Sequence, residues 1–194
     1  MGRTYEVIDA DLAAWIDAQP VLFVATAPTG PGGHVNCSPK GVRGTFRILD
    51  EHRVALLDLT GSTVETVAHV RQNGRITLMW CAFEGAPRIV RLHGQARVVS
   101  VGQEGFAELV DGFGTYPAAR AVLIIEASRI TDSCGFGVPL MELQGERTQL
   151  DAWARAKGPD GLTEYQATRN TQSIDGLPGL DLPAADGAGA LTAP

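Results

Sequence analysis

Compact apolar runs separated by short polar turns fill the first two-thirds of the chain. Asp9, an apolar set at helical spacing and a terminating Pro20 predict a capped helix over residues 10–19. The runs that follow are rich in β-branched and aromatic residues and are bounded by glycine, proline or aspartate, which is typical of strands. We predict strands at residues 21–27, 34–38, 45–49, 53–59, 75–83, 88–99 and 121–130.

Between these predicted strands, apolar residues at helical spacing occur in only a few stretches. Residues 63–73 predict a helix that Gly74 ends in a left-handed conformation, and residues 103–113 predict another. From Glu142 onward the pattern becomes helical, with a second short helix around residues 162–170. About seven strands, short turns and no repeated βα spacing predict a mainly β fold with flanking helices, an antiparallel barrel or sandwich.

Charge and hydropathy narrow the classes of partner. The 194 residues carry 16 basic and 22 acidic side chains, a formal net charge of −6. The positive charges are spread singly, which argues against nucleic acid because phosphate neutralisation needs a clustered basic face. No apolar run approaches the ~20 residues of a membrane-spanning helix, and the N-terminus has no signal-peptide core. We therefore expect a cytoplasmic protein with no membrane partner.

Cysteine and histidine are too scattered to indicate a metal site or a disulfide framework. Cys37, Cys81 and Cys134 form no Cys-x-x-Cys pair, and the four histidines are isolated along the chain. We predict no metal. For Cys37 and Cys134 the pattern favours buried, unreactive thiols, with contact to a cofactor as the alternative.

Two polar clusters at predicted strand ends are the candidates for chemistry. One spans residues 36–41 and contains Lys40, and the other spans residues 58–63 and runs into the helix. A helix start attracts anions through its free N–H groups and its dipole, and Ser62 and Thr63 add hydroxyl donors. Lys40 would complete a phosphate site as a point charge.

Each cluster also has a plain structural explanation, and the sequence leaves both open. Ser62 and Glu65 have the spacing of a capping box, in which each side chain satisfies a backbone donor. A lysine at a strand end is usually a solvated charge. No phosphate-binding glycine loop, nucleophile elbow or zinc-protease motif occurs in the chain.

Three stretches make the chain resemble the flavin-binding split barrels related to pyridoxamine 5'-phosphate oxidase. They are residues 36–41, residues 57–63 leading into a helix that ends Asn73-Gly74-Arg75, and residues 88–94. The resemblance covers roughly residues 10–135. It implies an antiparallel split β-barrel, a homodimer that holds FMN at the subunit interface. It also implies that a lysine and the residues opening the next helix grip the phosphate.

The resemblance assigns cofactor-binding residues to the same stretches, with Lys40 as the lysine and Ser62 as the helix-opening serine. The full implied set is Ser38, Lys40, Asp58, Leu59, Thr60, Ser62, Thr63 and Arg91. Catalytic residues stay unknown, because hydride chemistry belongs to the cofactor and needs no protein acid or base. We expect an FMN-binding split-barrel domain over residues 1–140, a helical extension over 141–180 that packs on the barrel or the dimer partner, and a disordered tail over 181–194.

The chain departs from the authentic oxidase in several places. Thr63 and Val64 replace an Arg-Lys pair, Ile89 replaces a flavin-contacting glutamine, and the substrate-holding C-terminal arginine and histidine have no counterpart. These differences argue against the vitamin substrate. We predict an FMN-dependent oxidoreductase that transfers hydride to or from an unknown small substrate; a deazaflavin-dependent reductase and a non-catalytic flavin- or anion-binding dimer are the alternatives. Trp80 and Phe83 would wall the flavin ring or, as is typical of strand aromatics, belong to the core.

Overall fold

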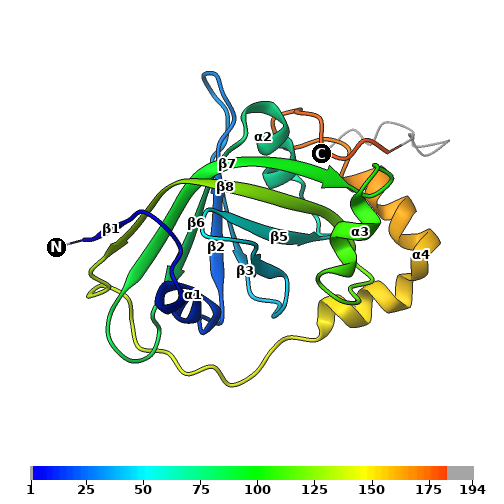
Figure 1. The fold of residues 1–194 in the computed structure, drawn as a ribbon. Coiled ribbons are helices and arrows are strands. Elements are labelled where there is room, and N and C mark those ends of the chain that lie inside the picture. The colour runs from blue at the N-terminus through cyan, green and yellow to red at the C-terminus, as the bar shows by residue number, and fades with distance from the viewer. Residues whose placement is uncertain (1, 183–194) are drawn as a thin grey trace.

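A strongly curled antiparallel sheet forms the body of the protein, and helices flank it (Figure 1). The computed structural model describes residues 2–182. Within that range the sheet has eight strands in the order β3-β2-β6-β7-β8-β5-β4, and β1 pairs with β8 beside this path. Every pairing is antiparallel. The mainly β, antiparallel fold with flanking helices is thereby confirmed.

The bounds of the elements follow the predicted runs closely in the first half of the chain. The strands are β1 (Thr4–Tyr5), β2 (Leu22–Thr26), β3 (Asn36–Lys40), β4 (Phe46–Ile48), β5 (Arg53–Leu59), β6 (Arg75–Cys81), β7 (Ile89–Ser100) and β8 (Ala119–Ser133). The helices are α1 (Ala10–Asp17), α2 (Glu65–Asn73), α3 (Phe106–Asp111) and α4 (Gln149–Arg169).

One face of the sheet is turned inward and forms the main core. Alternate residues of β2, β6 and β7 are buried there, among them Leu22, Trp80 and Leu92. The Trp80 ring meets the Phe46 ring edge-on, with 5.2 Å between centroids. Trp80 is only 2% exposed and belongs to the core, and it also lines a cavity beside Lys40. Period-two alternation explains this face, because every second strand residue points the same way.

Helices close the two ends and part of the outer face of the curled sheet. α1 packs on the inward face, and the Asp9 carboxylate caps it by accepting a 2.8 Å hydrogen bond from the Leu12 N–H, as predicted. α2 ends at Gly74, which has the predicted left-handed conformation (φ 72°). α3 covers the outer face of β5 and β8. α4 packs Ala154 against Ala118.

Some predicted boundaries are wrong. β3 begins at Asn36, two residues later than expected. The pairing of β3 with β2 starts at Asn36 opposite Thr26, and the loop before Asn36 has no partner on β2. The helix expected over residues 103–113 is limited to Phe106–Asp111, since Gly105 has φ 80° and cannot continue it backwards.

The C-terminal third differs most from the prediction. Residues 142–148 are irregular instead of helical, and α4 then continues across a kink at Gly158 (φ 66°, ψ 175°), which precedes Pro159. Of the expected tail, only residues 181 and 182 are described, and residues 183–194 lie outside the described part. No helix within residues 2–182 combines the length and apolar character that a membrane span requires.

Candidate functional site

Three charged side chains meet at one end of the curled sheet. Lys40 Nζ lies 2.8 Å from Asp58 Oδ1, and Arg120 Nε lies 2.7 Å from Asp58 Oδ2. The Asp58 side chain is fully buried. Burial on its own raises the pKa of Asp58, but attraction by Lys40 and Arg120 outweighs it and holds the pKa at about 2. The carboxylate is therefore charged at neutral pH.

Strand register explains why these three residues meet. Lys40 pairs with Leu22 and so points to the inward face, where Asp58 also points. A bulge between Asp58 and Leu59 leaves Arg120 of β8 without a register partner on β5. Bulges redirect a side chain in this way, and here the Arg120 guanidinium is directed at the buried carboxylate.

This cluster retains capacity for an anion. Its two cations and one carboxylate carry a net charge of +1. Lys40 is 22% exposed at its side chain and lines a cavity of about 310 Å³ beside α1 and the loop after β3. Arg120 Nη1 is buried and has no hydrogen-bond partner among the described residues. Lys40 therefore has N–H donors left for an acceptor in this cavity, whereas Arg120 is not among the residues that line it.

A second polar chain joins β3 to α2. The Ser38 hydroxyl donates to Asn36 Oδ1 at 2.7 Å, and Asn36 Nδ2 donates to the hydroxyls of Thr26 (3.1 Å) and Thr66 (3.0 Å). Thr26 Oγ1 in turn lies 3.0 Å from Nδ1 of the buried His69. Burial lowers the pKa of His69, so the imidazole is neutral at pH 7. Ser38 is thus part of a network that fixes α2 against the edge strand.

The loop between β5 and α2 is held by α4. The buried Thr60 hydroxyl donates to the Ala118 carbonyl at 2.9 Å and accepts from Gln166 Nε2 at 2.8 Å. Asn170 Nδ2 donates to the Gly61 carbonyl at 3.0 Å, and Asn170 is fully buried. Two side chains from the end of the chain therefore fix the backbone that leads to the helix start.

The start of α2 is not a capping box, so that prediction is wrong. The N-cap residue is Val64, and it makes no side-chain cap. Glu65 instead accepts a 3.0 Å hydrogen bond from the Ile174 N–H. Burial raises the pKa of Glu65, but hydrogen bonds from backbone N–H groups, the first of them at Ile174, and from the Thr63 hydroxyl lower it on balance. Ser62 and Thr63 are exposed.

The structure does not bring all the predicted site residues together. Ser38, Lys40 and Asp58 lie on the inward face, and Thr60 is buried in the following loop. Ser62 and Thr63 are not among the residues that line the Lys40 cavity. Lys40 and the start of α2 therefore do not share that cavity within one chain.

Two remaining predicted residues face away from this cluster. Leu59 points to the outer face and packs with residues of α3 and α4. Arg91 also points outward, beside its register partner Met79, and donates a 3.0 Å hydrogen bond from Nη1 to Ser133 Oγ. Arg91 and Lys40 thus lie on opposite faces of the sheet.

Two cysteines expected to be buried are exposed. Cys37 and Cys134 are both exposed, and Cys37 pairs with Ala25 on the outer face of the edge strand β3. An edge strand has a neighbour on one side only, so its outward side chains stay open. Among residues 2–182 no three side chains of histidine, cysteine or acid type are placed to hold a metal ion.

Sequence reasoning missed Arg120, Gln166 and Asn170. Arg120 gave no signal, because the bulge that redirects it cannot be identified from residue types. Gln166 and Asn170 stand four residues apart, which places them on one face of a helix. That spacing was the available hint that the C-terminal helix presents polar groups to the barrel.

Comparison with known proteins places this chain in a family. Residues 8–134 match the family model described as pyridoxamine 5'-phosphate oxidase, which is more than half of the chain. The chain belongs to the pyridoxamine 5'-phosphate oxidase family. A relative in this family is "Pyridoxamine 5'-phosphate oxidase family protein ustO" of Aspergillus flavus. It is 39% identical over 192 residues, which cover 91% of this chain and 77% of that protein.

Solved structures agree with this family fold. HupZ of Group A Streptococcus superposes with a TM-score of 0.51 at 24% identity, covering 63% of this chain and 91% of HupZ. A histidine-to-alanine variant of HupZ gives a TM-score of 0.53, covering 65% of this chain and 99% of that one. At this identity the likeness concerns the fold alone. The oxidase family model ends at residue 134, before the segment that contains Gln166 and Asn170.

Proposed function

We propose that this member of the pyridoxamine 5'-phosphate oxidase family binds FMN and acts as an oxidoreductase on a small substrate. The Lys40–Asp58–Arg120 cluster carries the proposal. It has a net positive charge and a partly exposed ammonium at a cavity wall. These features fit the phosphate of a flavin mononucleotide, which needs cationic and N–H donors.

The chain's own residues would hold and orient the cofactor. Lys40 would donate to the phosphate, and Asp58 would keep the ammonium in place by its 2.8 Å contact. Ser62 and Thr63 are exposed and do not line the Lys40 cavity of their own chain, so they would add hydroxyl donors from a second copy. When bound, the flavin supplies hydride transfer at its N5 atom, so the protein needs no acid or base of its own for that step.

The separation of the predicted residues favours a homodimer as the form that binds the cofactor. Lys40 points to the inward face of the sheet and Arg91 to the outward face, so one ligand cannot contact both within a single chain. A second copy could bring its outward face to the Lys40 end of the first. We therefore include a homodimer with a shared site in the proposal.

One observation favours a second candidate, a non-catalytic anion-binding protein. The start of α2, where a flavin phosphate would profit from free N–H groups, is already served by the Glu65 carboxylate. A carboxylate at that position repels a phosphate and weakens flavin binding. Such a protein would bind small anions at Lys40 without retaining a flavin.

A titration distinguishes these functions. The purified protein is examined for oxidised-flavin absorption and then titrated with FMN and, separately, with a deazaflavin coenzyme. We expect Lys40→Ala to weaken FMN binding by about 10- to 150-fold, because a charge-assisted hydrogen bond contributes roughly 1.5–3 kcal/mol. Lys157→Ala is the matched control, since Lys157 is the second of the chain's two lysines and is exposed on α4.

The outcomes have separate meanings. Flavin absorption that bleaches when a reduced nicotinamide nucleotide is added supports the oxidoreductase. A colourless protein that takes up neither cofactor but binds inorganic phosphate supports the second candidate. Equal FMN affinity of Lys40→Ala and Lys157→Ala would exclude Lys40 from the site, provided that both variants unfold at the same temperature as the parent.

A further inference from the structure

An extended segment without a role in the proposed cofactor site crosses one end of the curled sheet. Residues 135–148, which we call the strap, connect β8 to α4 and pass across the ends of β2 and β3 (Figure 1). The strap is tied down at two points. The Met141 N–H donates to the Phe83 carbonyl at 3.0 Å, and Arg43 Nε lies 2.8 Å from Glu146 Oε1.

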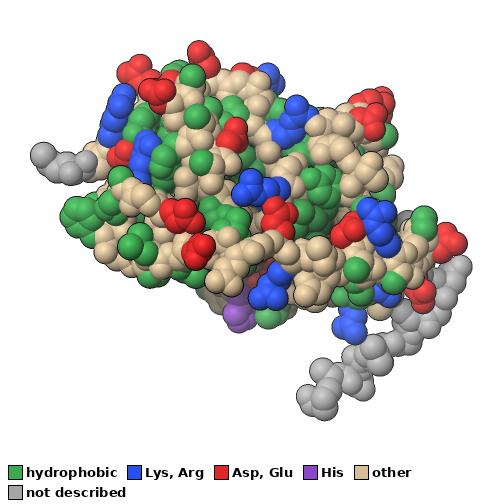
Figure 2. Space-filling view, turned by 90° about the horizontal axis from the view of Figure 1, so that it is seen from below, with side chains coloured by type: hydrophobic (Ala, Val, Ile, Leu, Met, Phe, Trp, Pro, Cys, Tyr) green, Lys and Arg blue, Asp and Glu red, His purple; other side chains and the backbone are tan. Residues whose placement is uncertain are grey.

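A cavity of about 390 Å³ lies between the strap and the sheet. Its volume is within the range of small-molecule sites, roughly 300–1,000 Å³. The walls are mainly apolar, and the apolar side chains are Pro20, Val21, Val42, Phe83, Met141 and Leu143. Met141 is 57% exposed and Leu143 is 45% exposed. Figure 2 shows this end of the molecule, with apolar side chains open to solvent among mixed acidic and basic ones.

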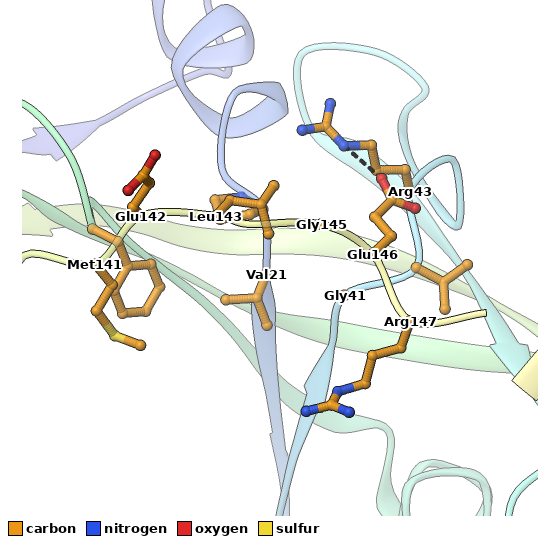
Figure 3. A pocket seen from close by; sticks show the side chains of 12 residues that line it. Val21, Gly41, Arg43, Met141, Glu142, Leu143, Gly145, Glu146 and Arg147 are labelled. Atoms are coloured by element: carbon orange, nitrogen blue, oxygen red, sulfur yellow. Dashed lines mark ion pairs between the residues drawn. The ribbon is translucent and has the colours of Figure 1, made fainter. Parts of the chain in front are cut away.

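The charged residues of this cavity leave one cation available. Arg43 and Glu146 neutralise each other in their ion pair. In Figure 3 the Glu142 carboxylate points away from Val21 on the far side of the strap, whereas Arg147 extends on the same side as Val21. Arg147 makes no hydrogen bond or ion pair with any residue between 2 and 182. The cavity thus combines apolar walls with one unpaired guanidinium.

We propose that the strap cavity binds a small organic anion. An apolar, ring-sized body would cover Val21, Phe83 and Met141, and a carboxylate or sulfonate would contact Arg147. A guanidinium presents paired N–H donors that match such an oxyanion. Burying the exposed apolar walls provides the rest of the affinity, because apolar area is removed from water.

This inference does not depend on the proposed cofactor. The strap lies beyond residue 134, where the family model ends. The strap cavity does adjoin the Lys40 cavity, because both are lined by Pro20, Val21 and residues 41–43. A molecule in the strap cavity would therefore lie directly beside the proposed FMN site.

A binding experiment on the full chain tests the proposal, with 2-naphthoate as the anionic probe and 2-naphthylmethanol as its neutral counterpart. We expect saturable binding of 2-naphthoate by calorimetry. Arg147→Gln should weaken it about tenfold or more, the effect of one charge-assisted contact, and leave the binding of 2-naphthylmethanol within about twofold. Leu143→Asp should weaken both probes. Arg97→Gln, which changes an exposed arginine of β7 far from the strap, should change neither.

Three results would overturn the proposal. The first is no saturable binding of 2-naphthoate, including to Glu142→Gln, a variant that removes the nearest acidic charge of the strap. The second is equal affinity of the parent and Arg147→Gln for 2-naphthoate. The third is competitive displacement of 2-naphthoate by FMN, which would assign the cavity to the cofactor. If the protein binds no FMN at all, the first two measurements still test whether the strap cavity binds an organic anion. Failure of the cofactor proposal is therefore distinguishable from failure of this one.

Discussion

Gln166 of α4 donates a 2.8 Å hydrogen bond from Nε2 to the hydroxyl of Thr60, and both side chains are buried. The contact spans 106 positions of the chain. It joins the C-terminal helix, which lies beyond the matched family region, to the loop that starts α2. The C-terminal extension therefore fixes the position of Ser62 and Thr63 relative to the barrel.

Removing this hydrogen bond should destabilise the protein. Gln166→Leu keeps the volume but leaves the Thr60 hydroxyl with the Ala118 carbonyl as its only remaining hydrogen-bond partner within residues 2–182. We expect the free energy of unfolding to fall by about 1–2 kcal/mol, the usual contribution of a buried hydrogen bond. Urea unfolding followed by circular dichroism measures it. In Gln172→Leu an exposed hydrogen bond to Gly176 is lost, and a change within about 0.5 kcal/mol is expected.

The same variant tests the positioning role separately from stability. If α4 positions the start of α2, Gln166→Leu should also weaken FMN binding, whereas Gln172→Leu should not. A stability loss without any change in FMN affinity would show that the contact only holds the helix in place.

Replacing the buried Asp58 should lower the free energy of unfolding much more than replacing an exposed aspartate. Asp58→Asn leaves Lys40 and the buried Arg120 side by side without a counter-charge. Breaking a buried ion pair on one side costs about 3–5 kcal/mol. Asp50→Asn is the matched control, because Asp50 and Arg53 form an exposed pair, and exposed pairs contribute little to stability. Chemical denaturation of both variants at pH 7 gives the comparison, and equal losses would contradict a buried role for Asp58.

The sequence predicted the strands and helix ends well where local rules decide them. Alternating burial along β7 and the left-handed Gly74 follow from side-chain period and glycine geometry, which need no tertiary information. The capping box expected at the start of α2 was wrong for the opposite reason. Ser62 has the right spacing for a cap. Two contacts with distant segments instead determine how the chain enters the helix: the Ile174 N–H donates to Glu65, and Asn170 donates to the Gly61 carbonyl.

The strap and the charged cluster were beyond sequence reasoning for related physical reasons. Residues 142–148 include good helix formers, yet tertiary ties at Met141 and Glu146 hold this stretch extended across the sheet. Asp58 and Lys40 were identified as site residues, but their partner Arg120 depends on a bulge that one sequence does not reveal. Long-range contacts, and not local propensity, decide both cases.

Lowering the pH should reduce the free energy of unfolding through protonation of Asp58. The pKa of Asp58 is about 2 in the folded chain, below its ordinary value of 3.8. A lowered carboxyl pKa stabilises the fold fully above about pH 4, and this contribution is lost as the pH falls from 4 towards 2. The difference between the two pKa values corresponds to roughly 2 kcal/mol. Urea unfolding at pH 7, 4, 3 and 2.5 should show this loss.

Asp58→Asn isolates the contribution of this carboxyl from those of other acids. Asp132 and Glu65 also have lowered pKa values and contribute to the acid sensitivity of both proteins. The stability gap between the parent and Asp58→Asn should therefore narrow by about 1 kcal/mol between pH 4 and pH 2.5, because the folded pKa of about 2 is not yet reached there. A gap that stays constant over this range would mean that the pKa of Asp58 is not lowered in the folded protein.

The bend of β7 over β8 should depend on one glycine. The register shifts between His93 and Gly94, and a Cβ atom at Gly94 would lie 2.3 Å from the Glu126 carbonyl oxygen and 3.0 Å from Ile125 Cγ2. Because the first contact is with backbone, Gly94→Ala forces the two strands apart, and overpacking of this kind costs about 1–3 kcal/mol. Gly137→Ala is the control, since nothing lies within 4 Å of its Cβ position. Thermal unfolding should show a clear loss for Gly94→Ala and an unchanged midpoint for Gly137→Ala; similar midpoints would mean that the strands are free to separate at the bulge.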